Sequence, residues 1–174
     1  GYCYTSGSAI FMLADGMGGH PDGEVAAQLA VQTIATMFQN EARPELPDVP
    51  AFLNNVVRAA HRHILRYAMD RAMLDPPRTT LVVAVVQDGA VAWTHCGDSR
   101  LYLIRRGELV TRTRDHSLLE HDLLKPSALQ PQAPKNRNVL FTCLGSPTKP
   151  VFAVVGPVSL QQGDRIMLCS DGLW

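Results

Sequence analysis

The sequence predicts an α+β fold, because two long segments with helical periodicity are combined with short apolar segments separated by turn residues. Strands joined by tight turns form antiparallel sheets, and two helices with one apolar face each must pack against such a sheet. With 174 residues the chain is long enough for one domain that buries about 70% of its unfolded surface. We therefore expect one domain over residues 1–174.

Composition and charge exclude several classes of partner. The 16 basic and 16 acidic residues cancel, so the chain as a whole attracts neither nucleic acid nor an anionic membrane. The longest aliphatic run, Leu81 to Val86, is far shorter than the roughly 20 residues of a membrane-spanning helix. The 4 cysteines contain no C-x-x-C pair, which favours free thiols in a reducing compartment. These features predict a cytoplasmic protein.

The first half of the chain contains a strand and two helices. Ser8 to Ala14 is apolar and runs into the Asp15-Gly16 turn, as at the end of a strand. Glu24 to Phe38 has apolar residues at helical spacing, and Asp22 is a candidate N-cap for this helix. After a loop with several prolines, a second helix is predicted from about Pro50 to Met73.

The second half of the chain predicts three pairs of strands. Two of them are hairpins with turns at Asp88-Gly89 and Arg106-Gly107, since a glycine tolerates the positive φ of a tight turn. The three expected pairs are 80–86 with 90–96, 101–104 with 109–113, and 151–155 with 165–169. A polar segment that contains prolines, residues 115–138, interrupts this series and is expected to form a surface flap.

Three aspartates occupy the same kind of position. Asp15, Asp98 and Asp171 each follow the end of an apolar strand. Carboxylates that converge from several strand ends would bind a hard divalent cation such as Mg²⁺ or Mn²⁺. The alternative is that each is an ordinary turn residue, because Asp and Gly are common in turns. The glycine-dense stretch 15–20 favours a site, since it suggests a backbone that approaches something closely.

Other catalytic motifs do not fit. Cys96 and Arg100 are separated by three residues, too few for the phosphate loop of a cysteine phosphatase, so Cys96 is expected to be an inward-facing strand residue. The chain has no lysine-containing P-loop and no G-x-S-x-G nucleophile elbow. His61 and His63 are too close in sequence to share one face of a helix as a zinc pair. His20, beside the acidic turn, is the histidine of interest.

With these residues in place, the chain resembles the metal-dependent protein phosphatases, the type 2C serine/threonine family, in their bacterial form. The resemblance implies an α-β-β-α sandwich, in which two stacked antiparallel sheets are flanked by helices and the metals lie in a channel at one end. The matching segments fall in family order and are Ala14–His20, Gly23–Ala26, Thr79–Val82, Gly97–Tyr102, Asp115–Leu118, Asn138–Leu140 with Leu144-Gly145, and Gly163–Arg165 with Cys169–Trp174.

The resemblance assigns roles to individual residues. Asp15 is similar to the carboxylate that bridges the two catalytic metals, and the carbonyl of Gly16 would bind the second of them. Asp171 is similar to a ligand of the first metal that also helps to hold a third, and Asp98 to the weaker ligand of that third ion. Two ions of Mn²⁺ or Mg²⁺, and up to three, are implied.

The flap and a proton donor complete the implied site. Asp115, His116 and Ser117 would begin the flap that borders the substrate groove, and His20 is a candidate acid for the leaving group. The family also has an Arg that grips the phosphate and an Asn-Glu-Asp segment ahead of the first strand, and an Asp-Asn pair near its end. None of these is recognised within residues 1–174, so we expect a domain that is truncated at both ends.

The resulting hypothesis is a protein phosphatase that hydrolyses phosphoserine and phosphothreonine with a metal-activated water. Its substrates would be phosphoproteins, including those of a serine/threonine kinase. Residues 1–174 alone are expected to bind metal weakly and to show little turnover. The alternative is a catalytically inactive binding or regulatory module that has kept the fold.

Overall fold

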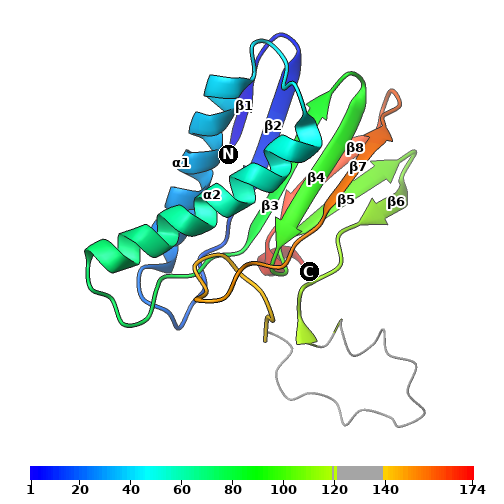
Figure 1. Cartoon of the computed structure of the whole chain (residues 1–174). Helices are drawn as coiled ribbons and strands as arrows, with labels where there is room; N and C mark the ends of the chain where they lie inside the picture. The colour runs from blue at the N-terminus through cyan, green and yellow to red at the C-terminus, as the bar shows by residue number, and fades with distance from the viewer. Residues whose placement is uncertain (119, 121–138) are drawn as a thin grey trace, which may run out of the picture.

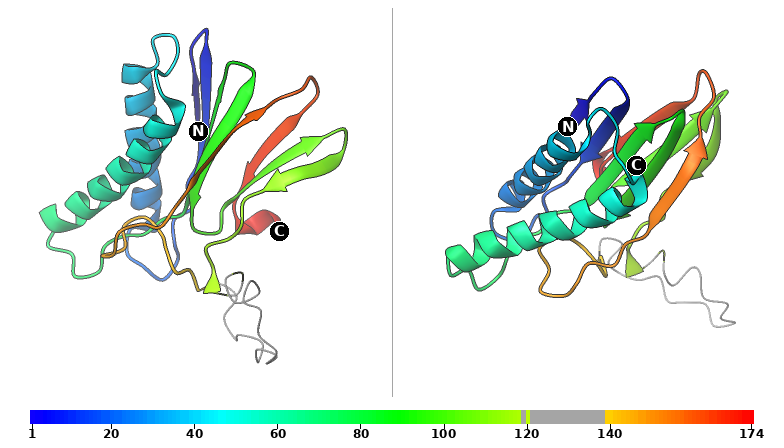
Figure 2. Two further views of the ribbon diagram at one scale, coloured as in Figure 1. Left: turned by 45° about the vertical axis from the view of Figure 1, so that its right-hand side comes forward. Right: turned by 45° about the horizontal axis from the view of Figure 1, so that its top comes forward.

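Two helices and two antiparallel sheets form successive layers in the computed structural model (Figures 1 and 2). The structure describes residues 1–118, 120 and 139–174. Both helices lie on one face of a five-stranded sheet, and a three-stranded sheet packs on its other face. The predicted α+β class and the pair of stacked sheets are therefore confirmed.

The two helices match the predicted segments closely. Helix α1 spans Gly23–Glu41 and helix α2 spans Val49–Asp70. Asp48 caps α2, because its side chain accepts a hydrogen bond from the Ala51 amide at 2.8 Å. Asp22 precedes α1 but makes no capping bond; it has a left-handed backbone and accepts a hydrogen bond from the Tyr67 hydroxyl at 3.0 Å instead.

The five-stranded sheet has the order β1-β2-β3-β4-β7 and the three-stranded sheet the order β6-β5-β8. Their strands are β1 (Tyr2–Tyr4), β2 (Ser8–Leu13), β3 (Leu81–Gln87), β4 (Ala90–Cys96), β7 (Val154–Ser159), β5 (Arg100–Arg105), β6 (Glu108–Arg112) and β8 (Arg165–Cys169). Strand β1, at one edge, was not predicted, since three residues are too few to show a period.

Both predicted hairpins are present with the expected turns. Asp88 and Gly89 have φ values of 52° and 69°, and Arg106 and Gly107 have 53° and 86°. These paired left-handed residues give the turn a twist that matches the flanking strands. The hairpin β3–β4 lies within the larger sheet, whereas β5–β6 forms most of the smaller one.

The third predicted strand pair is wrong. Strand β7 covers 154–159 rather than 151–155, and it pairs with β4, while β8 pairs with β5 in the other sheet. The segment between them crosses from one sheet to the other, held by the hydrogen bond from the Leu160 amide to the Gly89 carbonyl at 2.8 Å. An alternation of apolar residues predicts that a strand has a buried face but does not determine which strand it pairs with.

Two apolar clusters form the core, one on each face of the larger sheet. Leu81, Val83 and Val85 of β3 pack toward the helices, and Val82 and Ala84 pack toward the second sheet. The unbroken aliphatic run 81–86 therefore belongs to a central strand that is covered on both faces.

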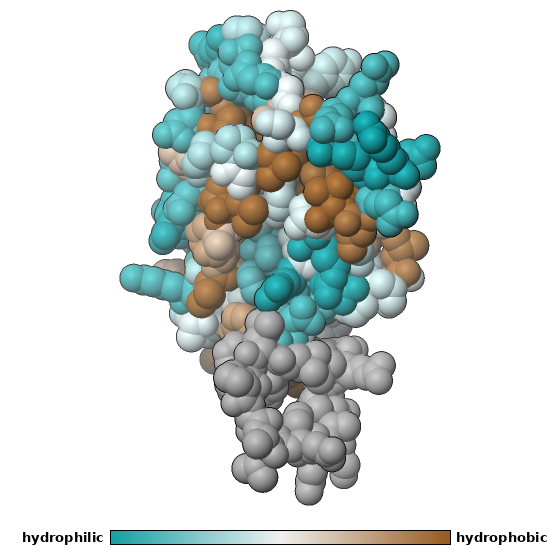
Figure 3. Space-filling view, turned by 90° about the vertical axis from the view of Figure 1, so that its right-hand side faces the viewer, coloured by the Kyte–Doolittle hydropathy of each residue, from teal (hydrophilic) through white to brown (hydrophobic). Residues whose placement is uncertain are grey.

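Each α-helix lies on the side of the larger sheet in the described part of the chain (Figure 1). Figure 3 faces the other side, where the smaller sheet lies, and shows apolar groups among polar ones. The exposed apolar residues of this sheet include Leu109 and Val110 of β6 and Met167 of β8.

Candidate metal site

The three aspartates that the sequence singles out line one pocket of about 380 Å³. Carboxylates that are 83 and 73 residues apart along the chain (Asp15 to Asp98, and Asp98 to Asp171) thus reach a common space. The lining residues are Asp15, Gly16, Met17, Gly18, Thr80, Asp98, Leu140 and Asp171. All four residues predicted as metal ligands belong to this set.

Strand register brings the aspartates together. Leu13, at the end of β2, is paired with Val82, and Cys96, at the end of β4, with Leu81. Asp15 and Asp98 each follow two residues after these ends, so they emerge on either side of the start of β3. In the smaller sheet, Cys169 at the end of β8 is paired with Arg100 at the start of β5. Asp98, just before β5, and Asp171, just after β8, therefore lie at the same end of these two strands.

Thr80 links the segments that carry Asp15 and Asp98. Its amide donates to the Asp15 carbonyl at 2.9 Å, and its hydroxyl accepts from the Asp15 amide at 3.2 Å. The same hydroxyl shares a hydrogen bond of 2.6 Å with the hydroxyl of Ser99. Thr79 adds a bond from its side chain to the Asp15 carbonyl at 2.9 Å. Because these hydroxyls are buried, they fix the backbone on both sides of the pocket.

Close backbone approach explains two of the glycines. A Cβ atom on Gly16 would lie 2.4 Å from the carbonyl carbon and oxygen of Gly23 at the start of α1. Gly97 has a φ of 106°, and a Cβ there would lie 2.9 Å from the Thr80 side chain. Gly18 and Gly19 would meet nothing within 4 Å. The close approach expected of the 15–20 stretch is thus confirmed at Gly16 and absent at Gly18 and Gly19.

The pocket concentrates negative charge. Burial, and then repulsion by Asp171, raise the pKa of Asp15, which the Ser170 hydroxyl partly offsets. Burial also raises the pKa of Asp98, and the charges of Asp171, Asp115 and Asp15 act in the same direction. Mutual repulsion of this kind requires the carboxylates to be neighbours and is relieved by a bound cation.

The donor set fits a hydrated divalent cation. None of the ion pairs found in residues 1–118, 120 and 139–174 involves Asp15, Asp98 or Asp171. The same residues contain no group of three or more His, Cys, Asp or Glu side chains that could hold a metal ion, so Asp15, Asp98 and Asp171 do not form a three-carboxylate cage. Mg²⁺ needs no such cage, because it keeps several waters and is held by one or two carboxylates.

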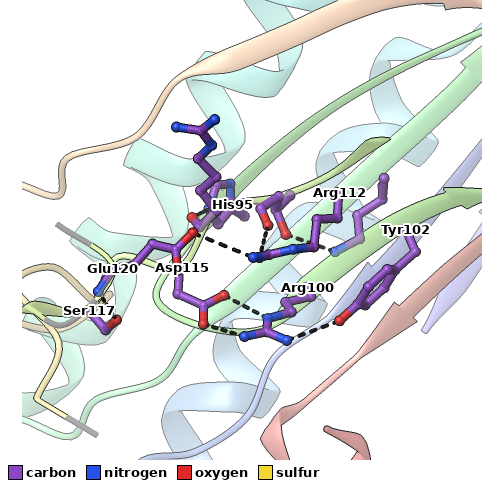
Figure 4. A network of polar contacts seen from close by, with 10 residues as sticks. His95, Arg100, Tyr102, Arg112, Asp115, Ser117 and Glu120 are labelled. Atoms are coloured by element: carbon purple, nitrogen blue, oxygen red, sulfur yellow. Dashed lines mark hydrogen bonds and ion pairs between the residues drawn. The ribbon is translucent and has the colours of Figure 1, made fainter. Parts of the chain in front are cut away.

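The predicted flap begins with a firmly anchored segment. The His116 amide donates to the Gly97 carbonyl at 2.9 Å, and the Gly97 amide donates to Nδ1 of His116 at 3.2 Å. Ser117 forms an isolated bridge with Leu140, which lines the pocket. Asp115 is buried and paired with Arg100 (Figure 4). The rest of the predicted flap, residues 119 and 121–138, lies outside the described residues.

His20 and Cys96 have different environments. His20 lies in the turn between Asp15 and α1, its Nδ1 is buried without a hydrogen-bond partner, and it is not among the described residues that line the pocket. Cys96 is fully buried, and burial raises its pKa to about 12. A thiol of this kind stays protonated, so the interpretation of Cys96 as a core residue is confirmed.

Sequence reasoning missed two parts of the site. The sequence motif contains Thr80 but does not predict that this residue joins two ligand segments. The pairing of Arg100 with Asp115 was also not foreseen. The Thr-Thr pair directly before an aliphatic strand is a signal that could have indicated the role of Thr80. The ion pair of Arg100 with Asp115 joins residues that are 15 positions apart, and only folding creates this contact.

The family model "Protein phosphatase 2C" matches residues 1–174. The chain therefore belongs to the protein phosphatase 2C family, a class of metal-dependent protein phosphatases.

Individual relatives agree with this class. The serine/threonine phosphatase stp of Listeria monocytogenes is 33% identical over 168 residues, which cover 94% of this chain and 66% of that protein. The crystal structure of the Mycobacterium tuberculosis serine/threonine phosphatase PstP/Ppp is 32% identical with a TM-score of 0.77, covering 99% of this chain and 72% of that one. A structure of the catalytic domain of PstP in complex with two manganese ions is 32% identical with a TM-score of 0.74, covering 99% of this chain and 71% of that one.

This chain thus spans just under two thirds of the length of the Listeria phosphatase. In the described residues, no helix is both long and apolar enough to cross a membrane.

Proposed function

We propose that the full-length protein hydrolyses phosphoserine and phosphothreonine in proteins, and that the pocket at the strand ends holds its catalytic metals. The observation that carries this proposal is the shared pocket of Asp15, Asp98 and Asp171. Membership in the protein phosphatase 2C family supports it, and so does the manganese complex of PstP.

The residues of the pocket have distinct roles in this proposal. Asp15, the Gly16 carbonyl and Asp171 would hold two ions of Mn²⁺ or Mg²⁺, and Asp98 would help Asp171 to hold a third. When bound, such ions supply a water of lowered pKa and neutralise charge on the phosphoryl oxygens. The chain's part is to fix these oxygen ligands, and Thr80 does so through its bonds to Asp15 and Ser99.

The remaining roles concern the substrate. Asp115, His116 and Ser117 begin a flap that borders the substrate groove. Either His20 or a metal-bound water would protonate the leaving serine or threonine oxygen. No covalent intermediate is required, which agrees with the burial of Cys96. Phosphoproteins that a serine/threonine kinase has modified are the proposed substrates, and signalling in the cytoplasm is the proposed setting.

Replacement of Asp15 tests the proposal. Asp15→Asn in the full-length protein is expected to lower Mn²⁺-dependent hydrolysis of a phosphopeptide by at least about 100-fold, because a ligand that holds both metals loses its charge. The matched control is Asp88→Asn, which removes a carboxylate from the exposed β3–β4 turn, where Asn tolerates the left-handed backbone. The control is expected to keep normal turnover.

Two outcomes would contradict the proposal. Full activity of the Asp15→Asn variant would show that the pocket does not take part in the reaction. A wild-type protein that binds Mn²⁺ but hydrolyses no phosphopeptide would favour the alternative, a binding or regulatory module that keeps the fold.

A further inference from the structure

Arg100 belongs to a network of polar contacts that also includes Tyr102 and Asp115 (Figure 4). Its Nε and Nη2 atoms donate to the two carboxylate oxygens of Asp115 at 2.8 and 2.7 Å, and its Nη1 donates to the Tyr102 hydroxyl at 3.1 Å. Both partners of the ion pair are shielded from water, since the side chain of Arg100 is 14% exposed and that of Asp115 is 7% exposed. A bidentate pair of this kind fixes both position and orientation.

One face of the same guanidinium group lies over the indole ring of Trp174. The Cζ atom of Arg100 lies 3.2 Å from the centre of the Trp174 ring. Trp174 directly follows the short 3₁₀ turn η1 (Asp171–Leu173), which begins with a candidate metal ligand. Stacking on an indole ring favours a planar guanidinium over an ammonium group.

Arg100 therefore contacts or adjoins three functional segments. Asp98 is two residues before it in the turn that enters β5, Asp171 belongs to the turn that ends in Trp174, and Asp115 begins the flap. The register of β5 with β8 reinforces this, because Arg100 is paired with Cys169. Removing the guanidinium would release two segments, the start of the flap and the turn before Trp174, from the strand that follows Asp98. It would also leave the buried Asp115 carboxylate without its cation.

We propose that Arg100 is a positioning residue of the metal pocket, which holds the turns of Asp98 and Asp171 and the first residues of the flap in one arrangement. This inference rests on the proposed function for its biological meaning. It goes further by assigning a role to a residue that does not itself line the pocket of the three aspartates. It also implies that Asp115 acts as the partner of Arg100 and not as a metal ligand.

The chain provides a matched control on the same strand. Arg105, at the other end of β5, donates from Nε and Nη2 to the two carboxylate oxygens of Asp164 at 2.8 and 2.7 Å. This second pair has the same two-pronged geometry, with Arg105 more exposed at 26% and Asp164 buried at 3%. It lies at the end of β5 opposite to Arg100, and Asp98 and Asp171 adjoin the Arg100 end. A purely structural role would make the two pairs equivalent, whereas a positioning role would not.

The experiment compares Arg100→Lys with Arg105→Lys in the full-length protein. Lysine keeps the positive charge but loses the two-pronged geometry and the stacking. The first readout is Mn²⁺ binding without substrate, measured by calorimetry or by the electron paramagnetic resonance signal of free Mn²⁺. Arg100→Lys is expected to lower the affinity of the weakest Mn²⁺ site about tenfold. Losses of about 10- to 100-fold are typical when a residue that supports the metal ligands is replaced. Arg105→Lys is expected to leave Mn²⁺ binding unchanged.

The second readout separates affinity for metal from the chemical step. At saturating Mn²⁺ the kcat of Arg100→Lys is expected to return close to the wild-type value, because the ligands themselves are intact. Trp174→Ala removes the stacking but leaves the ion pair, and is expected to weaken the same Mn²⁺ site less, by about threefold. This second variant carries the test if Arg100→Lys does not fold.

Unchanged Mn²⁺ binding in both Arg100→Lys and Trp174→Ala would overturn the inference, as would an equal loss in Arg105→Lys. A failure of the proposed function can be distinguished from a failure of this inference. If the wild-type protein binds Mn²⁺ without hydrolysing phosphopeptide, and Arg100→Lys still weakens that binding, the positioning role stands and only the enzymatic proposal falls.

Discussion

Single residues without a metal-binding side chain help to determine the shape of the pocket. Gly16 passes so close to the start of α1 that no side chain fits, and Thr80 joins the backbone of Asp15 to Ser99. These residues act by holding the carbonyl and carboxylate oxygens in place. Their substitution should therefore affect both stability and metal affinity.

A comparison of two glycines tests this at the residue scale. Gly16→Ala is expected to lower the free energy of unfolding by about 1–3 kcal/mol, because the added methyl group would overlap the Gly23 backbone. Gly18→Ala in the same stretch should cost far less, since a Cβ there meets nothing within 4 Å. Urea unfolding of both variants measures the difference. Equal losses would show that the close approach at Gly16 is not the cause.

Between elements, the first residues of the flap are attached to the turn between β4 and β5. The ring of His116 stacks on that of His95 with centroids 4.3 Å apart, and its Nδ1 accepts the hydrogen bond from the Gly97 amide. Burial, followed by the charge of His95, lowers the pKa of His116 to about 4, although Asp115 opposes the shift. The neutral ring is thus the form that holds these elements together.

This contact predicts a dependence of stability on pH. Folding lowers the pKa of His116 from its ordinary value of 6.5 to about 4. Between these two pH values the folded state therefore binds fewer protons than the unfolded state. The stability that the neutral ring contributes is present above pH 6.5 and is lost as the pH falls toward 4. Urea unfolding across this range should show a smaller loss for His116→Gln than for the wild type.

The exposed His63 on α2 offers a control, because it contacts Thr33 on the surface and lies away from the flap. His63→Gln is expected to keep the wild-type dependence on pH. The interpretation fails if His116→Gln and the wild type lose stability in parallel.

The sequence predicts the helices and hairpins better than it predicts the pairing of the last two strands. The helices and the two hairpins depend on local patterns, such as the apolar spacing of α2 and the left-handed turn at Asp88-Gly89. The pairing of β7 with β4 depends on which neighbour is available after the sheets have stacked, and the prediction of a pair between β7 and β8 was wrong for that reason.

At the scale of the whole molecule, the sandwich brings three carboxylates to one end and leaves their repulsion uncompensated. Burial first, and then the charges of neighbouring carboxylates, raise the pKa values of Asp15 and Asp98. A cation that binds only the folded state stabilises it in proportion to the logarithm of its concentration.

Divalent cations are therefore expected to raise the melting temperature. At a free Mn²⁺ concentration about 100 times the Kd, the gain should be about 2.7 kcal/mol, and a chelator should remove it. Asp171→Asn should reduce the gain, whereas Asp75→Asn, whose carboxylate is on the surface in a pair with Arg78, should not. Scanning fluorimetry with and without Mn²⁺ measures both. A melting temperature that does not respond to Mn²⁺ would contradict the assignment of the pocket as a metal site.

The sequence by itself determined the α+β class, the helices, the hairpins and the three candidate aspartates, because each depends on residues that are near one another along the chain. Only the tertiary structure decided that β7 and β8 belong to different sheets, that Thr80 joins two ligand segments and that Arg100 pairs with Asp115. These are contacts between distant segments, and they form when strand register and the stacking of two sheets bring those segments to the same edge. The physical reason is that periodicity encodes which face of an element is buried, whereas the partner of that face is selected by the packing of the whole chain.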